Sequence, residues 1–397
     1  MGQMTMDELA RAKQAFAFAP LLDAAFAEAG TGAKAFRDET FFPNLEKVLA
    51  IPHNIDISLS GVQIMQANSL RFLVNRLRWE ADVEKHPEIL DEDVDDPIVV
   101  LGLPRSGTTK MQRFLSADPA LQATPAWAMW NPAPFPGEQR GDPTPRRQWA
   151  AAMMNAVTNT GETYQKMHEF AADEAEESSF IPIMNFDSIG QFITAPDYSY
   201  LDWFRSRSRV PSQAYLKEML KYLQWQQGGK RGPWLLKNPC NTGEFLEVLE
   251  VFPRATFMIS RRDLLKTMGS SMRMGTEILQ NTFDPLDPKF VGQYTVDIWA
   301  YETKRYQQQL RDKGPEVRLL EADYNTCVKD GISVARDLYD LAGLPWTKEG
   351  EAAMRQWDID NPRHKLGSYG YDLTDYGWSE EKIVEAFGPI VEEWRGK

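Results

Sequence analysis

The chain has 397 residues, enough for one large domain or two ordinary ones. Its hydrophobic content of 43% and charged content of 25% are ordinary for a globular protein, and no apolar run approaches the ~18 residues of a membrane-spanning helix. The formal net charge of -13 argues against general binding of nucleic acids or other polyanions, so an anionic ligand needs a local positive site.

Residues 1–95 are predicted to form a helical segment that packs on the core. One buried helical face is indicated by the spacing of Leu70, Leu73, Val74 and Leu77. The stretch from Met1 to Arg11 lacks the basic-then-apolar layout of a signal peptide, and the two cysteines imply no disulfide framework. We therefore expect a cytoplasmic protein.

Short apolar runs alternate with helical stretches from residue 96 onward. This alternation predicts an α/β domain over 96–397, with a central parallel sheet and helices on both of its faces. The Pro-rich stretch 131–147 is expected to be a loop, at the start of a helical insertion spanning about 131–230. One helix in it is predicted to begin at Pro211-Ser212 and end at Gly228-Gly229. The candidate strands are 98–101, 234–236, 255–259 and 317–320.

A candidate phosphate-binding loop, Gly102-Leu-Pro-Arg-Ser-Gly107-Thr108-Thr109, directly follows the first candidate strand. Two glycines separated by four residues let backbone N–H groups curl around a phosphate, and the next helix points its positive end at that phosphate. The lysine that ATP- and GTP-binding loops carry is absent, since Thr108 stands in its place and Arg105 lies inside the loop. Such a loop suits a single 5′ phosphate group better than a triphosphate with its metal ion.

The Pro-Arg-Ser-Gly-Thr-Thr segment resembles the 5′-phosphosulfate loop of sulfotransferases that use PAPS (3′-phosphoadenylyl sulfate). It is most similar to the bacterial branch that resembles tyrosylprotein sulfotransferases, and the likeness runs from about residue 60 to about residue 390. The resemblance implies a P-loop-like three-layer fold, PAPS as co-substrate, PAP as its desulfated product, and no metal. It assigns donor binding to Arg105, Ser106, Gly107, Thr108 and Thr109.

Two later strand ends match the same family. Arg262, with Ser270 eight residues after it, resembles the 3′-phosphate motif, in which an arginine fork and a hydroxyl converge on one phosphate. Lys237 lies in a segment that resembles the one whose lysine touches the bridging oxygen between phosphate and sulfate. A cation there stabilises charge on the leaving phosphate, so Lys237 and Arg105 are candidate catalytic residues as well as donor ligands. The family often has a histidine a few residues later, where this chain has Asn241.

The segment 363–371 resembles a late basic segment of the family that closes over the nucleotide, which makes Lys365 a further candidate donor ligand. A basic loop before the last helix explains this segment equally well.

Sulfuryl transfer also needs a base near the acceptor hydroxyl. Tyrosylprotein sulfotransferases carry a glutamate shortly after the loop, but Ala128 stands where related bacterial sequences show one. His168 is the leading candidate, because it alone of the four histidines lies beside a carboxylate cluster that can orient it. A surface histidine among solvated acids is the alternative, and Glu176 and Glu177 are the next candidates for the base.

The acceptor is expected to be a small molecule with a hydroxyl group, apolar or aromatic in character, and the sequence carries no signal for an oligomeric state. This expectation rests on aromatic residues that line apolar pockets as readily as cores. Two other functions stay open: a metal-dependent P-loop kinase or nucleotide hydrolase with a degenerate loop, and a non-catalytic nucleotide-binding protein. The aromatic residues are Trp127, Trp130, Phe135, Phe180, Phe186, Phe192, Tyr198, Tyr200 and Trp203.

Overall fold

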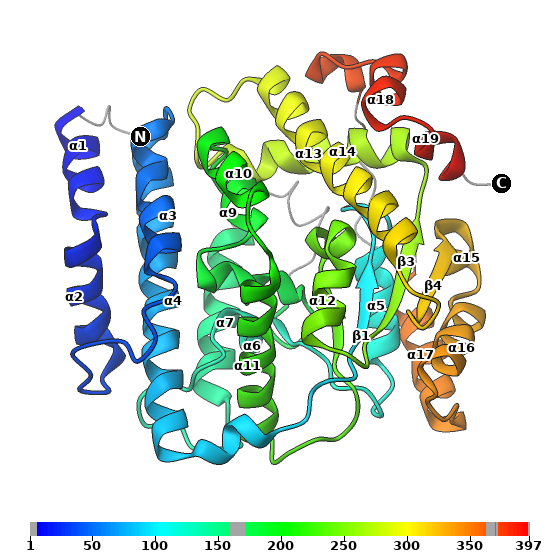
Figure 1. The fold of residues 1–397 in the computed structure, drawn as a ribbon, viewed down its shortest axis with the longest axis horizontal. Helices are drawn as coiled ribbons and strands as arrows, with labels where there is room; N and C mark the ends of the chain where they lie inside the picture. Colours follow the sequence, from blue (N-terminus) through cyan, green and yellow to red (C-terminus); the bar gives the residue numbers. More distant parts are fainter. Residues whose placement is uncertain (1–5, 159–170, 363–369, 371, 396–397) are drawn as a thin grey trace.

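The computed structural model describes residues 6–158, 171–362, 370 and 372–395. Its centre is a four-stranded sheet in the order β2-β1-β3-β4, and each neighbouring pair of strands is parallel (Figure 1). All four predicted strands are present, each within a few residues of its expected position. The strands are β1 (Ile98–Leu101), β2 (Leu235–Lys237), β3 (Thr256–Arg261) and β4 (Leu319–Asp323).

Helices surround this sheet. The α-helices are α1 (Met6–Ala15), α2 (Phe18–Ala29), α3 (Phe42–Asn54), α4 (Leu59–Lys85), α5 (Thr108–Ser116), α6 (Ala126–Trp130), α7 (Thr144–Thr158), α9 (Ile189–Thr194), α10 (Tyr198–Arg205), α11 (Val210–Gln226), α12 (Phe245–Val251), α13 (Leu264–Leu279), α14 (Pro288–Asp312), α15 (Tyr324–Lys329), α16 (Gly331–Ala342), α17 (Lys348–Asp360), α18 (Glu380–Phe387) and α19 (Ile390–Glu393). Short 3-10 helices are η1 (Pro87–Asp91), η2 (Ser178–Phe180), η3 (Pro182–Asn185), η4 (Pro239–Gly243) and η5 (Leu373–Tyr376).

Both faces of the sheet are buried, which explains why β1 is a continuous apolar run rather than an alternating one. Val99 and Leu101 point into a large core cluster with residues of α12, α13 and α14. Ile98 and Val100 point into a second cluster with residues of α5, α16 and α17. The expected α/β fold, a parallel sheet between two helical layers, is confirmed.

The first helices form one flank of the molecule, and α15 to α17 lie at the opposite flank (Figure 1). Ser58 caps α4 by accepting a hydrogen bond from the backbone N–H of Gly61. On α4, Leu73, Val74 and Leu77 are buried, as expected from their spacing, and Leu70 is partly buried against the same cluster. None of the helices in the described ranges is both long enough and apolar enough to cross a bilayer.

Of the two elements predicted in the insertion, the helix is found as expected and the loop is shorter than expected. The predicted helix after Pro211 is α11, with the proline in its first turn, where no intrahelical N–H bond is lost. The predicted loop 131–147 is wrong at its end, because α7 begins at Thr144. Asp142 accepts hydrogen bonds from the backbone and side chain of Thr144 there, and Pro145 is tolerated in a first helical turn.

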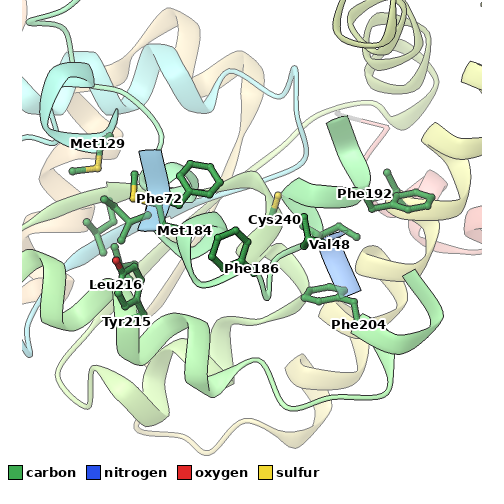
Figure 2. Close-up of a cluster of buried hydrophobic side chains, with 14 of the residues drawn as sticks. Val48, Phe72, Met129, Met184, Phe186, Phe192, Phe204, Tyr215, Leu216 and Cys240 are labelled. Atoms are coloured by element: carbon green, nitrogen blue, oxygen red, sulfur yellow. The ribbon is translucent and has the colours of Figure 1, made fainter. Parts of the chain in front are cut away.

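Phe186 of the insertion packs against aromatic residues of the N-terminal helical segment. The ring of Phe186 lies 6.0 Å from that of Phe41 and 5.8 Å from that of Phe72, measured between centroids. Figure 2 shows Phe186 at the middle of this apolar cluster, with Phe72 and Met184 beside it. These side chains therefore join the insertion to α3 and α4.

Candidate active site

Three of the expected motifs meet at the carboxyl ends of adjacent strands. The candidate phosphate loop leaves β1, Lys237 is the last residue of β2, and Arg262 directly follows β3. The chain crosses from β1 to β2 on one side and then to β3 on the other, so β1 lies at a topological switch point. Open α/β sheets bind ligands at this position.

The loop after β1 contains three residues with positive φ angles. Gly102, Arg105 and Gly107 have φ angles of 135°, 69° and 85°, and such left-handed turns form anion-binding concavities. A Cβ atom at Gly102 would lie 2.7 Å from Ser106 Oγ and 2.9 Å from the carbonyl oxygen of Ser260. Glycine is therefore required at that position by both conformation and space.

The loop is held by hydrogen bonds from three sides. The hydroxyl of Ser106 donates to the carbonyl of Leu103 at 2.7 Å, and Ser260 Oγ donates to the carbonyl of Ser106 at 2.6 Å. The N–H of Gly102 donates to Thr242 Oγ1 at 3.1 Å. Ser106 thus shapes the loop with its side chain, while α5 begins immediately afterwards at Thr108 and directs its N-terminus at the same place.

The residues expected to bind the 5′ phosphate form hydrogen bonds with those expected to bind the 3′ phosphate. Nη1 of Arg262 donates to the carbonyl oxygen of Arg105, and Nε of Arg105 donates to Ser270 Oγ at 3.1 Å. The guanidinium of Arg262 lies over the ring of Tyr324, 4.6 Å from its centroid, and its Nε is buried without a hydrogen-bond partner. Asp263 caps α13 by accepting a hydrogen bond from the N–H of Leu265.

Lys237 forms an ion pair with Glu177. Nζ of Lys237 donates to Oε1 of Glu177 at 2.5 Å, the lysine side chain is 0% exposed and the glutamate side chain is 23% exposed. Oε2 of Glu177 accepts from Ser179 Oγ at 3.0 Å. Both carboxylate oxygens are therefore positioned by named donors.

Residues 173–179, here called the acidic segment, reach this strand end through hydrogen bonds over long sequence distances. Ser178 Oγ donates to the carbonyl of Lys237 at 3.2 Å, beside β2. The carbonyl of Glu176 accepts from Gln112 Nε2 and Thr124 Oγ1, both at 2.8 Å. Gln112 lies on α5, so the segment is tied both to the helix after the phosphate loop and to β2.

The two neighbouring glutamates differ in their surroundings. The side chain of Glu176 is 1% exposed, and its Oε2 lies 3.9 Å from Nη2 of Arg113. Its Oε1 accepts from the N–H of Glu177 at 2.9 Å. The carboxylate of Glu176 is therefore buried and bonded to the protein, whereas the carboxylate of Glu177 is partly exposed to solvent.

A mostly apolar cavity of about 240 Å³ opens beside the loop and both glutamates. Its walls come from the loop, the acidic segment, α9, η4, α13 and α14. The lining residues are Pro104, Glu176, Glu177, Ser179, Phe180, Ile183, Gly190, Ile193, Thr194, Pro239, Cys240, Ser271, Met274, Gly275, Ile278, Tyr294, Thr295 and Trp299.

Two other ionisable groups in the cavity wall are neutral at neutral pH. Burial raises the pKa of the Cys240 thiol well above its ordinary value. Burial also raises the pKa of the Tyr294 phenol. Neither of these two side chains is therefore a proton acceptor at neutral pH.

The remaining candidate residues have different outcomes. His168 and Lys365 fall outside the described residues. Of the aromatic residues considered for the acceptor pocket, Phe180 lines this cavity, whereas Phe186, Phe192 and Tyr200 are buried in the core. Aromatic content alone does not distinguish a pocket from a core, because both exclude water.

The cavity wall formed by α13 and α14 was not predicted from the sequence. Ser271, Gly275 and Ile278 follow the i, i+4, i+7 spacing of one helical face. That signal is present in the sequence, but it is typical of ordinary core helices. Asn241 is also structural, since its Oδ1 accepts from Asn238 Nδ2 at 2.9 Å and from Gln213 Nε2 at 3.1 Å.

Comparisons with known proteins agree with this architecture. The family model described as "Sulfotransferase family" matches residues 97–348, more than half of the chain. The chain is 24% identical over 311 residues to omega-hydroxy-beta-dihydromenaquinone-9 sulfotransferase Stf3 of Mycobacterium bovis, covering 74% of this chain and 75% of that protein.

Two solved structures have a similar fold. The crystal structure of sulfotransferase STF9 from Mycobacterium avium matches with a TM-score of 0.82 and 24% identity, covering 95% of this chain and 96% of that one. The crystal structure of sulfotransferase STF1 from Mycobacterium tuberculosis H37Rv matches with a TM-score of 0.80 and 22% identity, covering 97% and 98%.

Proposed function

This chain belongs to the sulfotransferase family and is an enzyme that transfers sulfate; we propose that it moves a sulfuryl group from PAPS to the hydroxyl of a small apolar or aromatic molecule in the cytoplasm. Membership in this family favours sulfuryl transfer over the kinase and over a non-catalytic nucleotide-binding protein. The observation that carries the proposal is that one apolar cavity shares Pro104 with the phosphate loop and Glu177 with the Lys237 ion pair.

The donor fits the residues at the three strand ends. The backbone concavity around Arg105 and the N-terminus of α5 suit the 5′ phosphate. Arg262 and Ser270 suit the 3′ phosphate, because the buried Nε–H of Arg262 can donate a hydrogen bond to a phosphate oxygen. Because Arg262 and Ser270 both contact Arg105, the two groups lie within the reach of one adenosine bisphosphate.

Lys237 and Arg105 are proposed to stabilise the negative charge that develops on the donor during transfer. As the sulfur–oxygen bond of the donor breaks, negative charge develops on the bridging oxygen. Lys237, on the strand next to the loop, is the candidate to stabilise that charge, together with Arg105 and the loop N–H groups. Ser106, Gly107, Thr108 and Thr109 complete the proposed donor site. This chemistry requires no metal.

The base has three candidates within one short stretch of the chain, His168, Glu176 and Glu177. Glu177 lines the cavity in which an acceptor hydroxyl would lie. His168 remains a candidate from the sequence, and Lys365 remains a candidate donor ligand. Histidine and glutamate both serve as general bases when a hydroxyl comes within hydrogen-bond reach.

The cavity also bounds the acceptor. An apolar cavity of about 150 Å³ is large enough to hold benzene, so about 240 Å³ accommodates a one- or two-ring alcohol or phenol. The mycobacterial relative is named for an omega-hydroxy menaquinone derivative, which is also a hydroxyl compound. A longer acceptor would have to extend beyond this cavity.

The test combines donor binding with turnover. We expect PAP to raise the melting temperature in the presence of EDTA, and ATP with Mg²⁺ to have no comparable effect. We expect sulfate transfer from PAPS to at least one member of a panel of phenols and alcohols, starting with 2-naphthol. Lys237→Met should lower turnover by at least 100-fold, because it removes the charge near the leaving oxygen.

Lys230→Met is the control, since Lys230 is an exposed lysine that pairs with Asp96 at 2.7 Å, away from the cavity lining. Its turnover should stay close to wild type. Stabilisation by ATP and Mg²⁺ alone, or equal turnover in Lys237→Met and wild type, would contradict the proposed function.

A further inference from the structure

We infer that Glu177 is the general base and that donor binding releases it from Lys237, an inference that rests on the proposed function. The two residues are 60 positions apart in the chain, and their side chains form the closest ion pair at the site. Lys237 is the residue proposed to contact the bridging oxygen of the donor, while Glu177 faces the acceptor cavity. One ion pair therefore connects the two substrate sites.

The burial of Lys237 dictates an exchange of partners. A buried ammonium group without a countercharge is strongly destabilising. Nζ of Lys237, on a side chain with 0% exposure, donates to Glu177 in this structure. The phosphosulfate group of the donor offers a second anion at the same end of the sheet, so Nζ can turn to it without losing a negatively charged partner.

Glu177 keeps its place when Lys237 turns away, because a second donor holds it. Ser179 Oγ donates to Oε2 of Glu177 at 3.0 Å, whereas Lys237 bonds to Oε1. Ser179 itself lines the cavity. Loss of the lysine contact therefore leaves the carboxylate at the cavity wall with Oε1 open to an acceptor hydroxyl.

The exchange changes the reactivity of the carboxylate. A carboxylate oxygen that accepts a charge-assisted hydrogen bond from an ammonium group is a weaker proton acceptor. When the bridging oxygen takes over Nζ, Oε1 regains its capacity to accept a proton. The acceptor hydroxyl then becomes a competent nucleophile only when the donor is present, which limits unproductive encounters.

The transfer step balances in atoms and charge. A bond forms between the acceptor oxygen and the sulfur, and the acceptor proton passes to Oε1 of Glu177. The bond between the sulfur and the bridging oxygen breaks, and its electron pair stays on the 5′-phosphate oxygen beside Lys237. The products are the sulfate ester, PAP and a protonated Glu177, which returns its proton to solvent.

Glu176 is a poorer candidate for this role. It is 1% exposed, lies 3.9 Å from Arg113, and accepts a hydrogen bond from the neighbouring backbone. Removing its charge would disturb the anchoring of the acidic segment. Glu177 is the carboxylate that combines access to the cavity with the contact to Lys237.

The exchange predicts opposite effects of Glu177→Gln on binding and on turnover. In the variant, Lys237 has no carboxylate partner, so the PAP anion no longer competes with an internal anion. We expect PAP to bind about tenfold more tightly by calorimetry, while turnover with PAPS and 2-naphthol, or the best acceptor of the panel, falls at least 100-fold. A residue with a purely structural role would weaken both.

Two further variants complete the experiment. Glu174→Gln is the matched control, because Glu174 is a 44% exposed carboxylate of the same segment, 3.6 Å from Arg113 Nε. It should leave PAP affinity and turnover unchanged. Ser179→Ala should lower turnover about tenfold without changing PAP affinity, since it loosens Glu177 but keeps the Lys237 contact.

Each outcome bears on a separate step. Unchanged or weaker PAP binding in Glu177→Gln would overturn the exchange. Wild-type turnover in Glu177→Gln would overturn its role as base, and wild-type turnover in Ser179→Ala would overturn the anchoring step. Failure of the wild-type protein to bind PAP would instead contradict the proposed function.

Discussion

Gly107 links the two proposed phosphate sites through a single aromatic ring. A Cβ atom at this position would lie 2.9 Å from both Cδ2 and Cε2 of Tyr324. The same ring carries the guanidinium of Arg262 at 4.6 Å from its centroid. A methyl group at Gly107 must therefore displace the ring that supports Arg262.

The cost of Gly107→Ala has two parts. Alanine at the observed φ of 85° costs ~1–2 kcal/mol, partly offset by ~0.4–1 kcal/mol from the stiffer unfolded chain. The steric part requires the ring to move by about half an ångström before the contact becomes ordinary. Arg262 then leaves its position against the carbonyl of Arg105, and we expect PAP affinity to fall at least tenfold.

Gly343→Ala separates the two parts. Gly343 has a φ of 69°, but its added Cβ would meet nothing within 4 Å. It should lose about 1 kcal/mol of stability in urea unfolding and keep wild-type affinity for PAP in calorimetry. If Gly107→Ala bound PAP as tightly as Gly343→Ala does, the proposed coupling of the loop to Arg262 through Tyr324 would be wrong.

Two other predictions concern buried charges outside the cavity. Burial raises the pKa of Asp187 from 3.8 to about 6, against the opposing effect of Arg207 at 4.0 Å. Because the pKa of Asp187 is higher in the folded than in the unfolded protein, the free energy of unfolding should fall by about 3 kcal/mol as pH rises from below 4 to above 6. Asp187→Asn should remove this fall from a plot of melting temperature against pH. An unchanged plot would show that Asp187 is not the group responsible. Arg209→Met should lower the free energy of unfolding, measured in urea, by ~3–5 kcal/mol, because it leaves two buried carboxylates without their cation. Arg209 bonds to Glu302 at 2.8 and 2.9 Å and to Glu244 at 2.7 Å. A loss below 1 kcal/mol would show that the negative charges of Glu302 and Glu244 do not depend on Arg209.

Local sequence patterns were sufficient to predict the sheet and the position of the candidate phosphate loop. The apolar run of β1, the two glycines and the start of α5 are contiguous, so their conformations follow from period, turn chemistry and helix capping within a few residues. Parallel pairing then brings Lys237 and Arg262 to the same edge, because the carboxyl ends of parallel strands coincide. The meeting of Arg105, Lys237 and Arg262 at one edge of the sheet was therefore predictable from the sequence.

The identity of the cavity wall depended on tertiary structure. Glu177 and Lys237 meet only because Ser178 and Gln112 tie the acidic segment to β2 and α5, and no local periodicity records such contacts. Likewise, Phe180 lines the cavity while Phe186 is buried in the core, although both are phenylalanines and lie only six positions apart. Short-range backbone preferences thus determined where the phosphate loop begins and ends, whereas the partner of each side chain across the site was decided by long-range packing, in which residues distant in the chain compete for the same space.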